Sequence, residues 1–438
     1  MKLFILIYNL ILSGALFLAL PFLPVLAIFS RKRRATLVQR FGLCTGIRRK
    51  KPHEQRIWVH ALSVGEVISA KPLLKGLQDK GVTVIFTAST LTGFNMARTL
   101  FLNGKTALVD QVALFPFDFF LSVNRVCSRI DPDRVILVET DLWPNFLWSL
   151  NRRKVPVFLV NARLSISSFR GYLRFKRIFG PVFSLFSMVL VQTGVDARRF
   201  RELGVDHKKI KVCGNLKFDQ EPPRVDPDQI AQFRHCLGRD NDLTLFLAGS
   251  THPGEEQLLA DLFLSIKPVC PPFVMVVAPR DPNRAEQIQE LFSRQGLEIR
   301  MLSTLKNRER REKVDIVIVD AMGLLSRLYA ACDIAFIGGS LAPFGGHNPL
   351  EAAAFSRPIL FGPHMEDFLL VAQMLVDHGG AFTVSDRDDL IRRTVQLIHD
   401  PVLAQSMGAR AADLFLKNRG AVDLTLSLIG CKGDVSSA

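Results

Sequence analysis

The stretch that decides the fold is "CDIAFIGGSLAPFGGHNPLEAAAFSRPILFG", residues 332–362. It opens with an uninterrupted apolar run, passes through two glycine pairs and closes on a second short apolar run. Continuous apolar runs bounded by glycine are typical of parallel strands that are buried on both faces. Between the two runs, Asn348 can cap a helix and Pro349 suits its first position. The stretch therefore predicts a strand, a glycine-rich loop, a helix and a second parallel strand.

Similar apolar runs recur along the chain and divide it into two domains. The runs predicted to be strands of the first domain are 56–62, 82–89, 134–139, 155–162, 188–193 and 209–215. Those of the second domain are 243–250, 273–279, 314–320, 332–339, 357–362 and 380–385. The proline-rich segment "QEPPRVDPD" between them indicates a linker. With helices in the gaps, the fold class is α/β, with two doubly wound domains.

The beginning of the chain has a different composition. Residues 3–29 carry no charge and are numerous enough to cross a bilayer, and the basic "RKRR" follows at 31–34. By the positive-inside rule, the rest of the chain should then lie in the cytoplasm. A cleaved signal peptide is the alternative, but it would have a shorter apolar core. The sequence therefore predicts a membrane anchor helix over 1–30, a first domain over 31–222 and a second over 223–438.

Charge and cysteine content restrict the class of protein. The formal net charge of +15 favours an anionic partner, which could be nucleic acid, a membrane surface or a phosphorylated substrate. The seven cysteines form no CxxC pair and lack the histidine spacing of zinc sites, so we expect reduced thiols and no metal. No GxGxxG follows the first strand of either domain, which disfavours a dinucleotide oxidoreductase.

Polar residues gather in the loops that follow the predicted strands of the second domain. The helix start after Asn348 suits a phosphate, and Gly345 and Gly346 let a ligand approach the backbone. Glu351 can accept hydrogen bonds from two neighbouring hydroxyls, as a ribose offers, or it can simply complement the helix dipole. Another strand-end loop carries Arg280, which can bind a phosphate or a base edge. Together these loops predict a nucleotide site.

The first domain has its own polar strand-end loops. Glu66 lies in "HALSVGEV", where it can be a general base for a substrate hydroxyl or only a partner of the helix dipole. Glu139 and Asp141 end an apolar strand in "VETDLWPNFL". Lys217 lies in "GNLKFD", just before the linker. Ligands of such sheets bind at the carboxyl ends of the strands, so we expect these residues to face a cleft between the domains.

The ordered set of these segments resembles one family. The segments are "WVHALSVGEV", "ETDLWPNFL", "NARLS", "GNLKFD", "GSTHPGEE", "APRDPNR" and "GGSLAPFGGHNPLEAAAF". Nearly the whole chain is similar to the 3-deoxy-D-manno-octulosonic acid (Kdo) transferases of lipid A assembly. The resemblance implies a GT-B fold, with two Rossmann-like domains around a cleft. It also implies transfer of Kdo from CMP-Kdo to a lipid A precursor, lipid IVA, on the cytoplasmic face of the bacterial inner membrane, without metal or cofactor.

The resemblance also assigns roles to individual residues. By motif position, Glu66 matches the general base, and Glu139 and Lys217 match groups that stabilise the transition state. The residues that match contacts to CMP are Pro279, Arg280, Met322, Gly323, Leu324, Asn348, Pro349, Leu350 and Glu351. Leu324 departs from the family pattern, which often has a glutamate there. The expected partners are CMP-Kdo, the lipid A precursor and inner-membrane lipids, with no nucleic acid.

Two alternatives stay open on the sequence. One is a GT-B enzyme that uses a UDP-sugar on a lipid-linked acceptor, because the second domain alone does not separate the two. The other is an inactive, membrane-anchored adaptor that has kept the GT-B fold. The motifs "SVGE", "ETDLWPN" and "GNLKFD" and the retained acidic residues favour the Kdo transferase.

Overall fold

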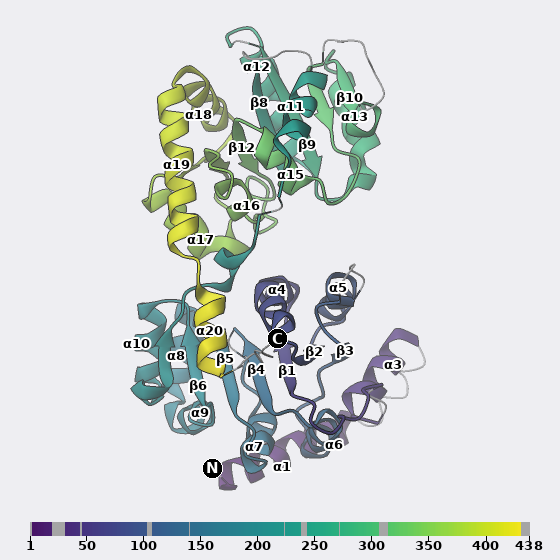
Figure 1. The fold of residues 1–438 in the computed structure, drawn as a ribbon, viewed down its shortest axis with the longest axis vertical. Coiled ribbons are helices and arrows are strands. Elements are labelled where there is room, and N and C mark those ends of the chain that lie inside the picture. The colour runs from purple at the N-terminus through teal and green to yellow at the C-terminus, as the bar shows by residue number, and fades with distance from the viewer. Residues whose placement is uncertain are drawn as a thin grey trace, which may run out of the picture. The chain divides into compact units, whose positions relative to one another are not determined.

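A computed structural model describes the chain in two compact units (Figure 1). The described residues are 2–19, 31–43, 46–102, 107–139, 141–222, 224–237, 243–270, 272–305 and 314–430. The first unit holds the residues up to Gln220 together with those from Arg419 onward, and the second unit is Glu221–Asn418. Within the described residues, each unit is built on one seven-stranded parallel sheet, so the predicted α/β class is confirmed.

The first sheet has the strand order β3-β2-β1-β4-β5-β6-β7. Its strands are β1 (Arg56–Ala61), β2 (Thr83–Ala88), β3 (Gln111–Leu114), β4 (Arg134–Val138), β5 (Val157–Ala162), β6 (Met188–Val191) and β7 (Ile210–Val212). The first six follow the Rossmann order, in which the direction of winding reverses between β1 and β4. Ligands of such sheets bind outside the carboxyl ends of the strands at this switch point.

The helices of the first unit cover both faces of this sheet. They are α1 (Lys2–Ala19), α3 (Arg31–Arg40), α4 (Val64–Asp79), α5 (Leu91–Leu102), α6 (Phe120–Ile130), α7 (Pro144–Arg152), α8 (Ile166–Arg174), α9 (Lys176–Phe183), α10 (Gly194–Glu202), η2 (His207–Lys209), η3 (Leu216–Asp219) and α20 (Ala421–Ile429).

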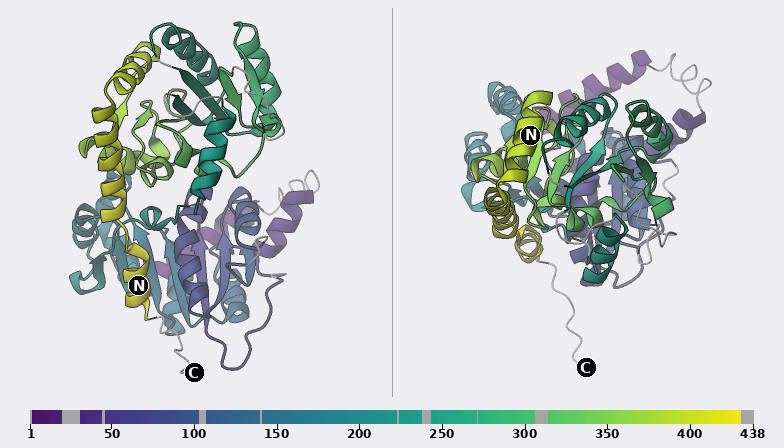
Figure 2. Two further views of the ribbon diagram at one scale, coloured as in Figure 1. Left: turned by 45° about the horizontal axis from the view of Figure 1, so that its top comes forward. Right: turned by 90° about the horizontal axis from the view of Figure 1, so that it is seen from above.

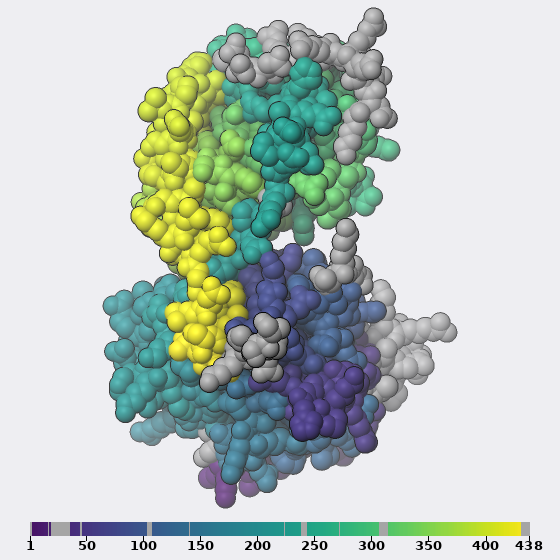
Figure 3. Space-filling model, viewed as in Figure 1, coloured from purple at the N-terminus to yellow at the C-terminus, as the bar shows by residue number. Residues whose placement is uncertain are grey.

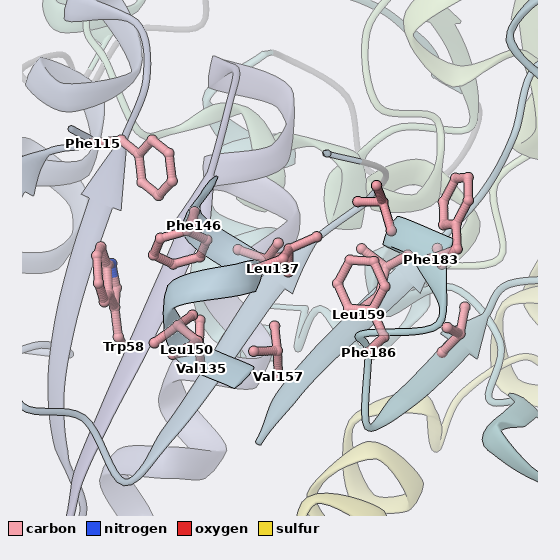
Figure 4. Packing of buried hydrophobic residues seen from close by; sticks show 14 of the residues in the cluster. Trp58, Phe115, Val135, Leu137, Phe146, Leu150, Val157, Leu159, Phe183 and Phe186 are labelled. Atoms are coloured by element: carbon pink, nitrogen blue, oxygen red, sulfur yellow. The ribbon is translucent and has the colours of Figure 1, made fainter. Parts of the chain in front are cut away.

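Successive side chains of the central strands point to opposite faces of the sheet, which produces two separate hydrophobic cores. On β4, Val135 and Leu137 join the core on one face, and Ile136 and Val138 join the core on the other, as the two-residue period of a strand requires. Figure 4 shows the first core, where Trp58 meets its neighbouring phenylalanines. Since β4 is buried on both faces, its sequence is a continuous apolar run and not an alternating one.

The second sheet has the strand order β10-β11-β9-β8-β12-β13-β14. Its strands are β8 (Thr244–Thr251), β9 (Phe273–Pro279), β10 (Ile299–Met301), β11 (Ile316–Ile318), β12 (Ile334–Ile337), β13 (Ile359–Phe361) and β14 (Ala381–Thr383). Its helices are α11 (Pro227–Cys236), α12 (Glu255–Ile266), η4 (Pro282–Arg284), α13 (Ala285–Ser293), α14 (Leu302–Leu305), α15 (Leu325–Ala331), α16 (Leu350–Ala353), η5 (Glu366–Phe368), α17 (Leu369–Asp377), α18 (Arg387–His399) and α19 (Pro401–Lys417). In this sheet the switch point lies between β8 and β12.

The last helix, α20, belongs to the first unit, so the prediction that the second domain runs to residue 438 is wrong. After α19, which packs within the second unit, the chain returns to the first (Figure 2). The Asp219 carboxylate accepts hydrogen bonds from Gly420 N at 2.6 Å and Val422 N at 2.5 Å and so fixes the start of α20. Helix α20 packs against α4 (Figure 3), and a Cβ at Gly76 of α4 would lie 2.6 Å from Leu426.

The N-terminal helix α1 lies against the first unit. Its Tyr8 hydroxyl donates to Asp118 Oδ2 at 3.1 Å, and Asn9 Nδ2 donates to Asn145 Oδ1 at 2.7 Å. In the part of the chain that the structure describes, no helix is long and apolar enough to cross a membrane. The predicted anchor helix over 1–30 is therefore not supported, and residues 20–30 lie outside the described ranges.

Candidate active site

Glu66 lies at the switch point of the first sheet, in the first turn of α4. Ser63 caps this helix, and its hydroxyl oxygen accepts a hydrogen bond from Glu66 N at 3.3 Å. In return, the Glu66 carboxylate accepts from Leu62 N at 2.5 Å and from Ser63 Oγ at 3.2 Å. The arrangement is a variant of the capping box, in which the serine caps the helix but the glutamate reaches back to Leu62 N, one residue before the N-cap. The motif "SVGE" therefore fixes the position of the carboxylate.

The environment of Glu66 makes it a better base than an exposed glutamate. The pKa of Glu66 is raised to about 7, chiefly by burial and also by the negative charges of Glu139 and Asp141, while the hydrogen bond from Leu62 N acts in the opposite direction. A carboxylate whose pKa lies near neutral pH accepts a proton readily and is still ionised in a large fraction of molecules. Helix capping alone does not require such a pKa.

Glu139 follows β4 directly and has a left-handed backbone, with φ of 61°. Its backbone N–H donates to Val160 O at 2.8 Å, which continues the hydrogen bonding of the sheet. Its carboxylate accepts a hydrogen bond from Arg163 Nε at 3.2 Å. A non-glycine residue in this region of φ is strained, and such strain gathers at functional sites. The structure therefore brings the predicted residues Glu66 and Glu139 to neighbouring strand ends on either side of the switch point.

Asp141 joins this group, together with a histidine that the sequence analysis did not single out. Asp141 Oδ2 accepts from Trp143 Nε1 at 2.9 Å and lies 3.3 Å from His60 Nε2. The His60 ring is buried at the end of β1 and stacks on Phe115 with ring centroids 3.8 Å apart. In the sequence, the signal for including His60 in the site is its place near the end of a central strand, two residues after Trp58. This signal is weak.

Lys217 lies in η3, which packs against α4. The backbone of η3 is held by side chains, since Leu216 N donates to Asn161 Oδ1 and Lys217 N donates to Asn215 Oδ1, at 3.1 and 3.0 Å. Asn161, the last residue but one of β5, has a φ of 56° and is a second strained residue near a strand end of this sheet. Lys217 is thus held beside the helix that carries Glu66.

The predicted CMP contacts gather at the carboxyl edge of the second sheet. Pro279 is buried at the end of β9, and Arg280 is exposed directly after it. Met322 is 68% exposed and Gly323 has a φ of 81°, in the turn between β11 and α15. Leu324 is the residue before α15 and is half-buried. Since β8, β9, β11 and β12 are consecutive neighbours in the sheet, their loops share one edge.

The loop after β12 differs from the prediction in two respects. The helix that follows, α16, is a single turn, so it has little of the dipole expected to hold a phosphate. Asn348 does act as a cap, with Oδ1 accepting from Leu350 N at 3.1 Å, while Pro349 and Leu350 are buried. Gly346 is required by packing, because a Cβ there would lie 2.4 Å from the Met365 sulfur, and a ligand is not needed to explain it.

The carboxylates of two glutamates hold this loop in place through hydrogen bonds. The carboxylate of Glu351 accepts a hydrogen bond from Ser326 Oγ of α15 at 2.5 Å. Glu255, in the first turn of α12, is fully buried, and its carboxylate accepts from Gly339 N, Ser340 N and Leu341 N at 2.8 to 3.0 Å. Glu255 is not among the residues predicted to form the site. The backbone N–H groups of Gly339, Ser340 and Leu341 therefore bind the protein itself and not a phosphate.

No cluster of three or more histidine, cysteine, aspartate or glutamate side chains is placed to hold a metal ion, as far as the described residues go. The five described cysteines, Cys127, Cys213, Cys236, Cys270 and Cys332, are free thiols.

The fold, two parallel-sheet α/β domains, resembles that of the GT-B glycosyltransferases. Two solved structures share this fold. One is UDP-GlcNAc 2-epimerase from Neisseria meningitidis, with TM-score 0.56 and 16% identity, covering 85% of this chain and 99% of that one. The other is a glycosyltransferase from Rickettsia africae, with TM-score 0.54 and 14% identity, covering 86% and 98%.

Sequence comparison identifies the family. Residues 35–220 match the family model described as 3-deoxy-D-manno-octulosonic-acid transferase (kdotransferase). The 3-deoxy-D-manno-octulosonic acid transferase of Haemophilus influenzae is 31% identical over 94% of this chain and 95% of its own length. That of Bordetella pertussis is 30% identical over 89% and 90%. The chain therefore belongs to the Kdo transferase family and is a glycosyltransferase.

Proposed function

We propose that this enzyme transfers Kdo from CMP-Kdo to a lipid A precursor, lipid IVA, in lipopolysaccharide biosynthesis. Membership of the Kdo transferase family supports Kdo as the sugar that is transferred. The observation that carries the mechanism is the Glu66 carboxylate, fixed by Leu62 N and Ser63 Oγ at the switch point and with its pKa raised to about 7.

The reaction needs one base and one leaving group. Glu66 removes the proton of an acceptor hydroxyl as the hydroxyl oxygen attacks the anomeric carbon of Kdo. The bond between that carbon and the phosphate oxygen breaks, and its electron pair leaves with CMP. Glu66 must be ionised to act, so turnover requires a pH near or above its pKa. Glu139 and Lys217 are proposed to stabilise the charges that develop in the transition state.

The second domain is proposed to bind the donor nucleotide. Arg280 is an exposed cation at a strand end, suited to the phosphate of CMP. Glu351 is held by Ser326 and can accept hydrogen bonds from the ribose hydroxyls. Pro279, the turn at 322–324 and the segment 348–350 complete the set of proposed contacts. If Glu351 only shaped the loop, neutralising it would leave CMP affinity unchanged.

The cytoplasmic face of the bacterial inner membrane is the proposed location. Helix α1 presents apolar side chains to solvent, with Leu3, Leu6 and Leu10 between 67% and 73% exposed. The basic "RKRR" follows close behind in sequence and suits anionic headgroups. An apolar helix face that is followed in sequence by basic residues favours a helix that lies in the membrane interface. Co-sedimentation with anionic vesicles tests this location, and complete absence of binding would contradict it.

One assay separates this function from its alternatives. Purified protein is incubated with labelled CMP-Kdo and tetra-acylated lipid A precursor, and the product mass is recorded. A mass gain of one or more Kdo residues supports the proposal. Product formed only with a UDP-sugar would instead support the GT-B alternative, and no product with any donor would support an inactive adaptor. Glu66→Gln, which keeps the shape and removes the charge, is the matched negative control.

A further inference from the structure

Two histidines meet across the switch point of the second sheet. His252 follows β8, and His347 lies in the loop after β12, the strand beside β8. Their Nε2 atoms are 2.9 Å apart and their ring planes differ by 11°. Phe344, 48% exposed, stacks on His252 with ring centroids 4.2 Å apart. The pair therefore stands where ligands of an open α/β sheet bind.

The surrounding backbone holds the two rings together. Gly339 has a φ of 69°, and a Cβ there would lie 3.2 Å from a ring carbon of each histidine. The buried Glu255 carboxylate accepts hydrogen bonds from both His252 N and Gly339 N, at 3.0 and 2.8 Å, and so ties the two loops to one group. The contact between the rings is thus part of the architecture of both loops.

The distance between the nitrogens fixes how many protons the pair can hold. At 2.9 Å one proton lies between the two Nε2 atoms, because two N–H groups facing each other would repel. The ring that accepts this proton must carry its own on Nδ1, and the donating ring is left with a bare Nδ1. One further proton on that bare Nδ1 turns the pair into a cation whose two Nδ1–H groups are both donors.

Burial and the positive charges nearby keep the histidine pair neutral in the free protein. The pKa of His347 is lowered to about 4, chiefly by burial and also by the positive charge of Arg280. Burial also lowers the pKa of His252, Arg280 and Arg284 act in the same direction, and Glu255 and Glu256 oppose them. Arg284 is paired with Glu256 at 2.8 Å, and Glu255 is occupied by backbone N–H groups. Arg280 is exposed, so an incoming anion can neutralise its charge.

We propose that the His252–His347 pair is an anion-binding element of the nucleotide site, which takes up one proton when a phosphodiester binds beside Arg280. The proposal rests on the proposed function for the presence of a nucleotide-sugar at this edge. A bound phosphodiester offsets the charge of Arg280 and accepts hydrogen bonds from Nδ1–H, so it favours the protonated pair.

The proposal predicts how the affinity for the phosphodiester depends on pH. Because the bound state holds one more proton than the free state, affinity rises as pH falls between the bound and the free pKa of the pair. One proton taken up corresponds to about tenfold in affinity per pH unit. A pair that serves only to join the two loops takes up no proton, and affinity is then flat in this window.

Calorimetry with cytidine 5′-methyl phosphate tests the proposal, since this diester has no group of its own that titrates near neutral pH. Binding to the full chain is measured at one pH in buffers of low and high ionisation enthalpy, PIPES and ACES. Wild-type protein should take up a proton, seen as a change of binding enthalpy with buffer. His347→Gln and His252→Gln should bind several-fold more weakly with no proton uptake. His378→Gln, a histidine that pairs with Asp413 away from these loops, should behave as wild type.

A second measurement needs no variant and uses only the wild-type protein. Nuclear magnetic resonance titration of labelled histidines in the wild-type protein should show the pKa of the pair rise when the diester is bound. Binding without proton uptake, and with an unchanged histidine titration, would overturn the proposal and leave the proposed function standing. Absence of any binding of the diester would overturn both. Uncharged cytidine, which lacks the phosphodiester, should bind without proton uptake, and uptake with cytidine would also contradict the proposal.

Discussion

Glu66→Gln should remove activity and stabilise the first domain at the same time. The Glu66 carboxyl has a pKa of about 7 in the folded protein, against a reference value of 4.5. Each pKa unit corresponds to about 1.4 kcal/mol, so the ionised carboxylate costs about 3 kcal/mol in the folded state above neutral pH. The amide of glutamine keeps the shape of the side chain and one acceptor for Leu62 N, and it carries no charge to desolvate.

The sign of the pH dependence follows from linkage. Because the folded pKa is raised, folded wild type binds more protons than the unfolded chain, and its stability falls as pH rises from about 4.5 to about 7. Glutamine does not titrate, so the stability advantage of the variant should grow over this window and level off above it. Thermal unfolding from pH 5 to 8 measures this, with about 2 to 4 °C expected for each kcal/mol in a domain of this size.

Turnover supplies the other half of the test. Loss of a general base should lower kcat by roughly 10²- to 10⁴-fold at pH 8. In wild type, kcat should fall about tenfold per pH unit below the pKa of Glu66 if chemistry limits the rate. If Glu66 served only in the capping box, the variant would lose about 1 kcal/mol of stability at every pH and keep its turnover. That result would refute the assignment.

Four further predictions address other parts of the molecule. Asp141→Asn removes a negative charge near Glu66, so the acidic limb of the kcat profile should move to lower pH, and an unmoved limb would count against that coupling. Glu351→Gln should weaken CMP binding by about 1.5–3 kcal/mol in calorimetry, the range for hydrogen bonds to charged groups, and unchanged affinity would exclude the ribose role. Glu255→Ala leaves at least four backbone N–H groups without their carboxylate, so urea unfolding should show a loss of at least about 3 kcal/mol, whereas a loss below about 1 kcal/mol would mean that other groups hold this loop. Leu10→Asp on the exposed face of α1 should reduce vesicle binding and leave turnover on a detergent-solubilised acceptor unchanged, and equal vesicle binding would rule out α1 as the contact.

Local patterns were sufficient for most described strands, including the edge strands β7 and β14, but not for the edge strands β3 and β10. The sequence predicted the central strands of both sheets, because a strand covered on both faces is an unbroken apolar run. It missed β3 and β10, and these are short edge strands at the same end of their respective sheets. The segment "IRM" of β10 carries a charge and has no apolar run of its own. Its pairing with β11 comes from the sheet and not from local preference.

The candidate site divides in the same way. The sequence by itself determined which residues stand at strand ends, because a buried strand followed by a capped helix is a local pattern, as in "HALSVGEV". Only the tertiary structure decided which of these strand ends are neighbours, since strand order depends on how the helices cross over the sheet. It placed Glu66 beside Glu139, brought His252 to 2.9 Å from His347, and returned α20 to the first unit. Contacts between residues some 95 positions apart leave no periodic trace in the chain, because their physical cause is the packing of the whole sheet.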